Sequence, residues 1–342
     1  MTSLNDAVKE YGVSKALVRV FAAACIGLLA VGCGSDQGGQ PQADKQLRVG
    51  YASALDPNDV ADQLGLEMAG AKVSTLTDDS SVVAGLLNDS LDVGNVDFDA
   101  AIKAKASGVP LKIVYVAQMK PEYDLVSRPE ITTPEQLAGK KVGFHAPGSQ
   151  TDIFVHSLLK EKIPAQYDQV DFLALEESSR RAQALAAGQL DAAVLEAINF
   201  AELKKQGDYH ELGTWADLTG DASAARGTAW ITTDEKYGSD KVALTKLVTS
   251  LQKGYDQTYA DKQAWLAAAK TTVPDVDQSL LPDVYETYVG QGMYPKSGQP
   301  PITPESFKQT ETFYRDLGGW DDEQSDEIVA YDLVDTGSGT AR

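Results

Sequence analysis

The chain has 342 residues, of which 43% are hydrophobic, and its formal net charge at pH 7 is −20. This length exceeds that of an ordinary single domain and predicts roughly two domains. The hydrophobic share is typical of a soluble globular protein with an ample core. The negative charge excludes the electrostatic attraction on which binding to nucleic acids or to anionic lipid surfaces depends.

The first 33 residues have the pattern of a secretory leader. Lys9, Lys15 and Arg19 precede an apolar run of 12 residues, Val20–Val31. A membrane-spanning helix needs about 20 apolar residues, so this run fits the core of a signal peptide instead. We therefore expect residues 1–33 to be a signal peptide.

The end of this leader, LLAVGC, resembles the lipobox of bacterial lipoproteins. Ala30 stands three positions before the cysteine, where a lipobox usually has leucine, and Leu29 lies one position earlier. The resemblance implies that Cys33 becomes the lipid-bearing N-terminus, so that the protein is anchored to the cell membrane on its extracytoplasmic side, at the cell surface or in the periplasm. A plain cleaved signal peptide is the alternative. Residues 34–46 are polar and rich in Gly and Gln, which predicts a flexible tether.

Both cysteines of the chain, Cys25 and Cys33, lie in the leader. The folded body therefore contains no free thiol, which excludes disulfides, zinc–thiolate sites and cysteine nucleophiles there.

From Leu47 onward, short apolar runs alternate with helical patterns, which is the signature of βαβ units. We expect strands at 47–52, 72–76, 91–96 and 111–118, with helices at 57–68, 80–88 and 98–107. A second series has expected strands at 141–145, 170–175, 190–195 and 209–212, with helices at 150–162, 178–187 and 197–205.

The two series resemble each other, which indicates a duplicated lobe. VGYASALDPND at Val49 parallels VGFHAPGSQTD at Val142, since each strand passes through Gly and an aromatic residue into a polar helix start. A strand at 227–232 would return to the first lobe, followed by helices at 241–259, 263–271, 275–288 and 304–317 packed on it. The expected organisation is lobe 1 at 47–128 and 226–335, lobe 2 at 129–225, and a disordered tail at 336–342.

Four stretches resemble the nitrate, sulfonate, taurine and thiamine-pyrimidine group of ABC-importer binding proteins. They are LRVGY, LDVGNVDFDAAIKAKASGVPLKIVYV, ITTPEQLAGKKVGFHAPGSQTD and ALAAGQLDAAVLEA, in that order along the chain. The resemblance implies a type II periplasmic-binding fold, with two doubly wound α/β lobes joined by crossover strands and closing on one small solute. It also implies an ABC permease and ATPase as partners; we expect a monomer.

Ligands of open α/β sheets bind beyond the carboxyl ends of the strands, and this rule selects the candidate ligand-binding residues. They are Ser53, Asp56, Asn58, Asn95, Asp97, Phe98, Tyr123, Gly148, Ser149, Gln150, Thr151, Glu196, Asn199 and Trp230. The stretch Gly148–Thr151 opens a helix, where free N–H groups suit an acceptor such as a carboxylate or sulfonate. Alternatively, Ser149 or Thr151 caps its own helix.

The charged residues near these strand ends favour a neutral or cationic solute, heteroaromatic ones included, over a sulfonate-type anion. The arginines that could grip an anion, Arg128, Arg180 and Arg226, lie on a linker, a helix start and a crossing. By contrast, Asp56, Asp97, Asp99 and Glu196 lie at or just beyond strand ends, where a carboxylate can pair with an amine. Each could instead cap a helix.

The sequence shows few signs of catalysis. It has no phosphate loop or dinucleotide fingerprint, and its three histidines, His145, His156 and His210, do not form a metal-binding pattern. No cofactor or metal is expected. A solute receptor for uptake is therefore the leading hypothesis. The alternatives are a surface sensor with the same fold and, with less support, a lipid-anchored enzyme that uses His145 and Ser149 as base and nucleophile.

Overall fold

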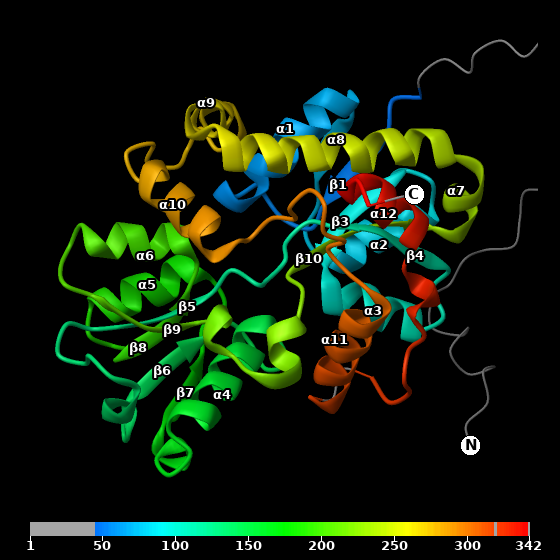
Figure 1. Cartoon of the computed structure of the whole chain (residues 1–342). Helices are drawn as coiled ribbons and strands as arrows, with labels where there is room; N and C mark the ends of the chain where they lie inside the picture. Colours follow the sequence, from blue (N-terminus) through cyan, green and yellow to red (C-terminus); the bar gives the residue numbers. More distant parts are fainter. Residues whose placement is uncertain (1–44, 318–319, 341–342) are drawn as a thin grey trace, which may run out of the picture. The chain divides into compact units, whose positions relative to one another are not determined.

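The computed structural model describes residues 45–317 and 320–340, which form two mixed β-sheets with flanking helices (Figure 1). The predicted signal peptide, Cys33 and all but the last two residues of the predicted tether lie outside the described residues. Within the described ranges, every helix is too short or too polar to cross a bilayer.

The first sheet has the strand order β2–β1–β3–β10–β4. Its strands are β1 (Arg48–Tyr51), β2 (Lys72–Thr75), β3 (Val93–Asp97), β4 (Leu111–Val116) and β10 (Thr228–Thr233). Strand β1 pairs in parallel with β2 and β3, whereas β10 runs antiparallel to both β3 and β4. The fourth strand therefore comes from a distant part of the chain.

The second sheet repeats this arrangement with the order β7–β6–β8–β5–β9. Its strands are β5 (Asp124–Ser127), β6 (Lys141–Phe144), β7 (Asp171–Ala174), β8 (Ala192–Leu195) and β9 (His210–Thr214). Here β6 pairs in parallel with β7 and β8, and β5 runs antiparallel to β8 and β9. In each sheet, the strand that is fourth in the spatial order follows a crossing of the chain between the lobes: β10 in the first sheet and β5 in the second. This confirms the predicted pair of α/β lobes joined by crossover strands.

The helices of the first lobe cover both faces of its sheet. They are α1 (Val60–Ala69), α2 (Asp79–Leu87), α3 (Phe98–Ala106), α7 (Asp234–Ser239), α8 (Lys241–Ala260), α9 (Lys262–Thr272), α10 (Leu281–Gln291) and α12 (Tyr331–Ser338). Helices α1 and α8 touch at Gly65 and Gly254, where a Cβ atom added to Gly65 would lie 2.5 Å from the Cα of Leu251. This approach requires glycine because any side chain would push the two helices apart.

The second lobe carries α4 (Gln150–Lys162), α5 (Ser178–Ala186) and α6 (Ala197–Lys204). Helix α11 (Pro304–Asp316) also packs on it, although the sequence predicted that all C-terminal helices pack on lobe 1. Tyr314 of α11 lies in the core of the second sheet, and the hydroxyl of Thr310 donates to the carbonyl of Ala224 at 2.6 Å. Helix α11 thus bridges the two lobes, since its Phe307 lies in the core of lobe 1 and its Tyr314 in the core of lobe 2.

Two predicted boundaries also differ from the structure. The sequence placed lobe 1 up to residue 128, but β5 already belongs to the second sheet. This four-residue strand is buried throughout and therefore has no alternating pattern to reveal it. The predicted disordered tail, 336–342, begins inside α12, whose Gly337 packs against the ring of Tyr115.

A buried ion-pair cluster joins the start of the described chain to the first lobe. The carboxylate of Asp92, whose side chain is 1% exposed, accepts from Nε of Arg48 at 2.9 Å and from Nζ of Lys236 at 2.8 Å, and Nζ of Lys45 lies 3.2 Å away. Burial alone would raise the pKa of Asp92, but the hydrogen bonds from these cations hold it far below its usual range. The cluster fixes β1 against β3 and α7.

We predict that Asp92→Asn destabilises the protein by about 3 kcal/mol at neutral pH, because it removes the buried charge with which Arg48, Lys236 and Lys45 all pair. A depressed carboxyl pKa contributes stability above the pKa of the unfolded chain and loses it as pH falls, so the difference between variant and wild type should shrink below about pH 4. Urea unfolding over a pH series measures both effects.

Asp89→Asn is the matched control, since Asp89 pairs with Arg48 and Lys236 but its side chain is 76% exposed. We expect it to cost much less than Asp92→Asn, because exposed ion pairs contribute little to stability. Equal losses in the two variants would contradict this account of the cluster.

Candidate functional site

A cleft of about 1420 Å³ is lined by residues of both lobes. Its walls are the segments that follow β1, β2, β3, β6, β7 and β8, at the carboxyl ends of the parallel strands, as the sequence rule predicted. A deeper recess of about 160 Å³ adjoins it and shares Ser53, Asp97, Tyr123 and Glu196 with the cleft lining.

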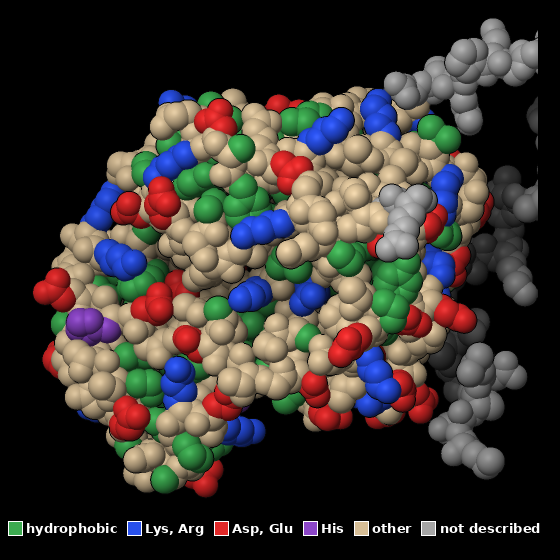
Figure 2. Space-filling view, viewed as in Figure 1, with side chains coloured by type: hydrophobic (Ala, Val, Ile, Leu, Met, Phe, Trp, Pro, Cys, Tyr) green, Lys and Arg blue, Asp and Glu red, His purple; other side chains and the backbone are tan. Residues whose placement is uncertain are grey.

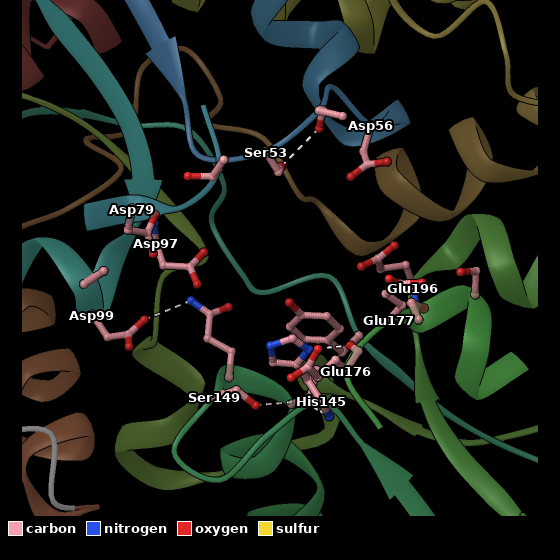
Figure 3. Close-up of a pocket in the computed structure, with 18 of the residues that line it drawn as sticks. Ser53, Asp56, Asp79, Asp97, Asp99, His145, Ser149, Glu176, Glu177 and Glu196 are labelled. Carbon is pink, nitrogen blue, oxygen red and sulfur yellow. Dashed lines mark hydrogen bonds between the residues drawn. The ribbon is translucent and has the colours of Figure 1, made fainter. Parts of the chain in front are cut away.

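The cleft lining is strongly acidic. On the outer face shown in Figure 2, acidic and basic side chains are interspersed. In the cleft, by contrast, the carboxylates outnumber the described basic side chains, which are Lys103 and Arg181. The carboxylates nearest the strand ends are those of Asp56, Asp79, Asp97, Asp99, Glu176, Glu177 and Glu196. Figure 3 shows Asp79, Asp97 and Asp99 on one side of the pocket and Asp56 and Glu196 on the other.

These carboxyl groups resist ionisation because they are removed from water and from cations. Burial raises the pKa of Asp79 to about 6. Burial, with a further contribution from the charge of Asp56, raises the pKa of Glu196 to about 7. Burial also raises the pKa of Asp97 well above its usual value, and Asp79 and Asp99 add to that shift. Within the described residues, none of these three groups has a salt-bridge partner within 4.0 Å.

Arg181 lines the cleft, but its guanidinium group donates hydrogen bonds to backbone carbonyls. It donates to the carbonyls of Val194 at 2.6 Å, Leu175 at 2.9 Å and Glu176 at 2.6 Å. Its side chain is buried and its pKa is lowered by that burial. Arg181 therefore braces the ends of β7 and β8 and moderates the pKa of Glu196 without forming an ion pair with it.

The start of α4 uses its own side chains to satisfy its N–H groups. Oγ of Ser149 accepts from the N–H of Asp152 at 3.3 Å, and Oγ1 of Thr151 accepts from the N–H of His145 at 2.8 Å. The carboxylate of Asp152 accepts from the N–H of Gly148 at 2.8 Å. The capping alternative raised from the sequence thus describes Ser149, and the carboxylate of Asp152 places a negative charge at the helix start.

His145 and Ser149 do not form a base–nucleophile pair. A ring nitrogen of His145 is hydrogen-bonded to the carbonyl of Glu176, whereas Oγ of Ser149 lies 2.9 Å from Oγ1 of Thr151. The arrangement therefore lends no geometric support to the enzyme alternative.

Two buried side chains tie the lobes together behind the cleft. Glu122, on the first crossing, accepts from the hydroxyl of Tyr288 at 2.6 Å, from Nδ2 of Asn58 at 2.7 Å and from the N–H of Ala197 at 3.1 Å. Gln150 at the start of α4 donates to Asp99 at 3.0 Å and to the carbonyl of Gly227 at 3.2 Å. These contacts hold helix starts of lobe 2 against the strand ends of lobe 1.

Most of the residues singled out from the sequence line the cleft or its recess. They are Ser53, Asp56, Asn58, Asn95, Asp97, Tyr123, Gly148, Ser149, Gln150, Thr151, Glu196 and Asn199.

Phe98 and Trp230 do not line the site, and their selection needs correction. Both are fully buried in the core of lobe 1. Trp230 lies in the middle of β10, where its Nε1 donates to the hydroxyl of Tyr255 at 3.2 Å and its ring meets the edge of Tyr51. Phe98 begins α3 but turns into the core. Aromatic residues at strand and helix starts are more often core than ligand contacts, and these two follow that rule.

Sequence reasoning missed several lining residues, of which Asp79 and Thr228 matter most. Asp79 opens α2 directly after β2, so the strand-end rule applied to that segment would have found it. Thr228 begins β10, whose antiparallel direction places its N-terminal end beside the carboxyl end of β3. That direction cannot be read from the sequence of β10 alone.

Comparison with known proteins identifies relatives of this chain. The sequence pattern of the family described as NMT1/THI5 like matches residues 63–264, more than half of the chain. No curated protein sequence gives a significant match.

Solved structures with the same fold include three sulfonate-binding proteins. The periplasmic aliphatic sulphonate binding protein SsuA from Escherichia coli has 15% sequence identity and a TM-score of 0.66, over 83% of this chain and 91% of that one. The alkanesulfonate-binding protein SsuA from Xanthomonas axonopodis pv. citri, bound to MOPS, has 18% identity and a TM-score of 0.58, over 83% and 97%. The putative sulfonate ABC transporter protein SsuA from Methylobacillus flagellatus KT has 14% identity and a TM-score of 0.64, over 86% and 93%. At these identities the likeness establishes the periplasmic-binding fold.

We predict that Glu196→Gln stabilises the unliganded protein increasingly as pH rises. The carboxyl of Glu196 has a pKa of about 7 when folded, against about 4.3 in an unfolded chain. The cost of ionising it in the folded state is therefore absent below about pH 4 and complete above about pH 7. We expect an excess stability of about 3 to 4 kcal/mol at pH 8 and little at pH 4, measured by urea unfolding.

Glu177→Gln is the control, because Glu177 is exposed and pairs with Arg180 at 3.1 Å. We expect its stability curve to run parallel to that of the wild type. A Glu196→Gln curve that also ran parallel would show that this carboxyl is not desolvated.

Proposed function

The chain belongs to the NMT1/THI5-like family, and we propose that it is the solute-binding component of an ABC import system that captures a small organic cation between its two lobes. The observation that carries the cation assignment is the interlobe cleft itself, in which Asp79 and Asp97 of lobe 1 and Glu196 of lobe 2 have no salt-bridge partner among the described side chains. The binding protein would deliver its solute to an ABC permease and ATPase, with no chemical conversion of the ligand.

Closure follows from the distribution of these carboxylates. Asp97 lies at the end of β3 in lobe 1, and Glu196 follows β8 in lobe 2. Without a ligand, burial favours the protonated forms of these carboxyls, since it raises the pKa of Asp97 well above its usual value and that of Glu196 to about 7. A cation between them pairs with the ionised forms and contacts both lobes, so it binds the closed form more tightly and shifts the population toward it.

A sulfonate, after which the structural relatives are named, is served less well by this cleft than a cation. An anion needs a donor group or a cation that is free to pair with it. Here Arg181 is bonded to backbone carbonyls, and the N–H groups of Gly148 and Asp152 are bonded to Asp152 and Ser149. The arginines considered from the sequence lie elsewhere: Arg128 pairs with Glu130, and Arg226 donates to the carbonyl of Pro301.

A cationic solute, including a heteroaromatic one, can pair with the carboxylates that line the cleft. An ammonium or protonated ring nitrogen donates hydrogen bonds to carboxylates, and Tyr123 in the lining offers an aromatic surface beside Asp97 and Glu196. Binding of a cation would lower the pKa values of these carboxyls and release protons.

We place the protein outside the cytoplasm, attached to the cell membrane by a lipid on Cys33. The leader, the lipobox-like LLAVGC and the polar segment 34–46 support this placement. Mass analysis of the mature N-terminus tests it: a diacylated or triacylated Cys33 is expected, and an unmodified N-terminus would rule out the anchor.

A surface sensor with the same fold remains the second candidate function, because a closing cleft could equally signal to a membrane partner. Genes for a permease and an ATPase beside this one favour uptake, whereas a neighbouring kinase or cyclase gene favours sensing.

The cation assignment predicts a clear order among ligands of matched size. We expect butylamine to bind and to raise the melting temperature, and 1-butanesulfonate and 1-butanol to have no effect at the same concentration. A ligand at 100 times its dissociation constant stabilises the folded state by about 2.7 kcal/mol. Asp97→Asn and Glu196→Gln should each weaken amine binding about tenfold or more, the value of one charge-assisted hydrogen bond.

Asp168→Asn serves as the control, since Asp168 is exposed and outside the cleft. It should leave amine affinity unchanged. Stabilisation by the sulfonate but not by the amine would reject the cation assignment while leaving the receptor function open. Absence of stabilisation by amines, sulfonates, nitrate and pyrimidines alike would reject the receptor function.

A further inference from the structure

The recess below the cleft contains polar atoms that the folded chain leaves unsatisfied. It lies where β3 meets β10, with Asn95 opposite Trp230 and Asp97 opposite Thr228 in the antiparallel register. Asn95 is 5% exposed. Neither its Nδ2 nor Oγ1 of Thr228 has a hydrogen-bond partner within the described ranges.

An unsatisfied N–H group at such a position needs an explanation. Buried polar groups in proteins are hydrogen-bonded almost without exception, because a buried group without a partner loses its hydrogen bonds to water and gains none in return. The lining of the recess includes Asn95, Thr228 and several carboxyls, so both side chains border a space that a ligand can enter, with the two unmet atoms buried in its wall. The two unmet atoms are independent of the acidic character of the cleft and mark the recess as part of the ligand site.

The chemistry of the recess restricts the group that fills it. Nδ2 of Asn95 is a donor and needs an acceptor, which an ammonium group cannot be. A carboxylate or sulfonate could accept, but it would lie against Asp56, Asp59 and Asp97, which also line the recess. A hydroxyl group fits both demands, since its oxygen accepts from the amide and its hydrogen donates to a carboxylate.

We propose that the ligand is an organic cation that also carries a hydroxyl group, and that this hydroxyl enters the recess and accepts a hydrogen bond from Nδ2 of Asn95. This inference rests on the proposed function and specifies its substrate class. The cation lies in the cleft between Asp97 and Glu196, and the hydroxyl reaches down past residues that the cleft and the recess share, such as Ser53 and Tyr123.

Thr228 provides the second contact in the recess. Its Oγ1 can donate to or accept from the ligand hydroxyl, and it lies in register with Asp97, one of the carboxylates that would hold the cation. Selectivity for a hydroxylated cation follows, because a ligand with a methyl group at that position would leave both polar atoms unsatisfied in a closed, dry recess.

Matched ligands test this proposal. The probes are 3-amino-1-propanol and butylamine, which differ only by a hydroxyl in place of a methyl group, titrated calorimetrically into the folded wild-type protein. We expect the amino alcohol to bind about tenfold more tightly. In Asn95→Ala this preference should fall to less than twofold, while butylamine affinity stays the same. Thr228→Val, which preserves side-chain shape, should also reduce the preference, so the test stands even if Asn95→Ala fails to fold.

Asn88→Ala is the matched control, because Asn88 is exposed at the end of α2, outside the cleft and recess. It should retain the full preference. Equal affinity for the two probes in the wild type, or a preference that survives in both Asn95→Ala and Thr228→Val, would overturn the proposal while leaving a cation receptor intact. If neither amine binds although 1-butanesulfonate does, the cation assignment fails and the hydroxyl inference fails with it.

Discussion

Carboxylates that face each other across a cleft, without an organised cation, dominate the electrostatics of this protein. In water such groups would ionise and be screened, but the cleft walls shield Asp79, Asp97 and Glu196 from solvent and raise their pKa values. The folded state tolerates this arrangement because the lobes pack elsewhere, through Glu122 on the crossing and through α6 and α11. Under the proposed function, a cationic ligand would supply the positive charge that these carboxylates lack, and its contacts with both lobes would favour closure.

The duplicated architecture explains how one chain brings these groups together. In each lobe the carboxyl ends of three parallel strands lie at one edge of the sheet, and the crossover strands β5 and β10 attach each lobe to the other half of the chain. The resulting site takes its residues from segments as distant in sequence as Asp56 and Glu196. The chain shares its fold with sulfonate-binding proteins, but fold and ligand chemistry are set by different residues.

The sequence predicts the elements and the edge of the sheet at which the cleft lies, because both depend on local periodicity. Asn95, Asp97 and Glu196 were selected in this way, and they line the cleft or its recess. The sequence does not predict what depends on strand direction or tertiary packing: the four-residue β5 has no alternation, Thr228 lies in the recess only because β10 is antiparallel, and α11 contributes to the cores of both lobes. Trp230 and Phe98 were assigned to the site because residue type alone cannot distinguish core aromatics from ligand contacts. The hydrogen bonds of Ser149 and Arg181 to backbone groups also cannot be read from the sequence.

The central claim is that a positively charged group of the ligand pairs with carboxylates of both lobes. A crystal structure of the protein with the ligand that co-purifies with it tests this claim most directly. We expect the cationic nitrogen of that ligand to lie within hydrogen-bond distance of the carboxylates of both Asp97 and Glu196. An anionic ligand seated at the start of α4, with Asp152 displaced and a lysine or arginine turned toward it, would contradict the account.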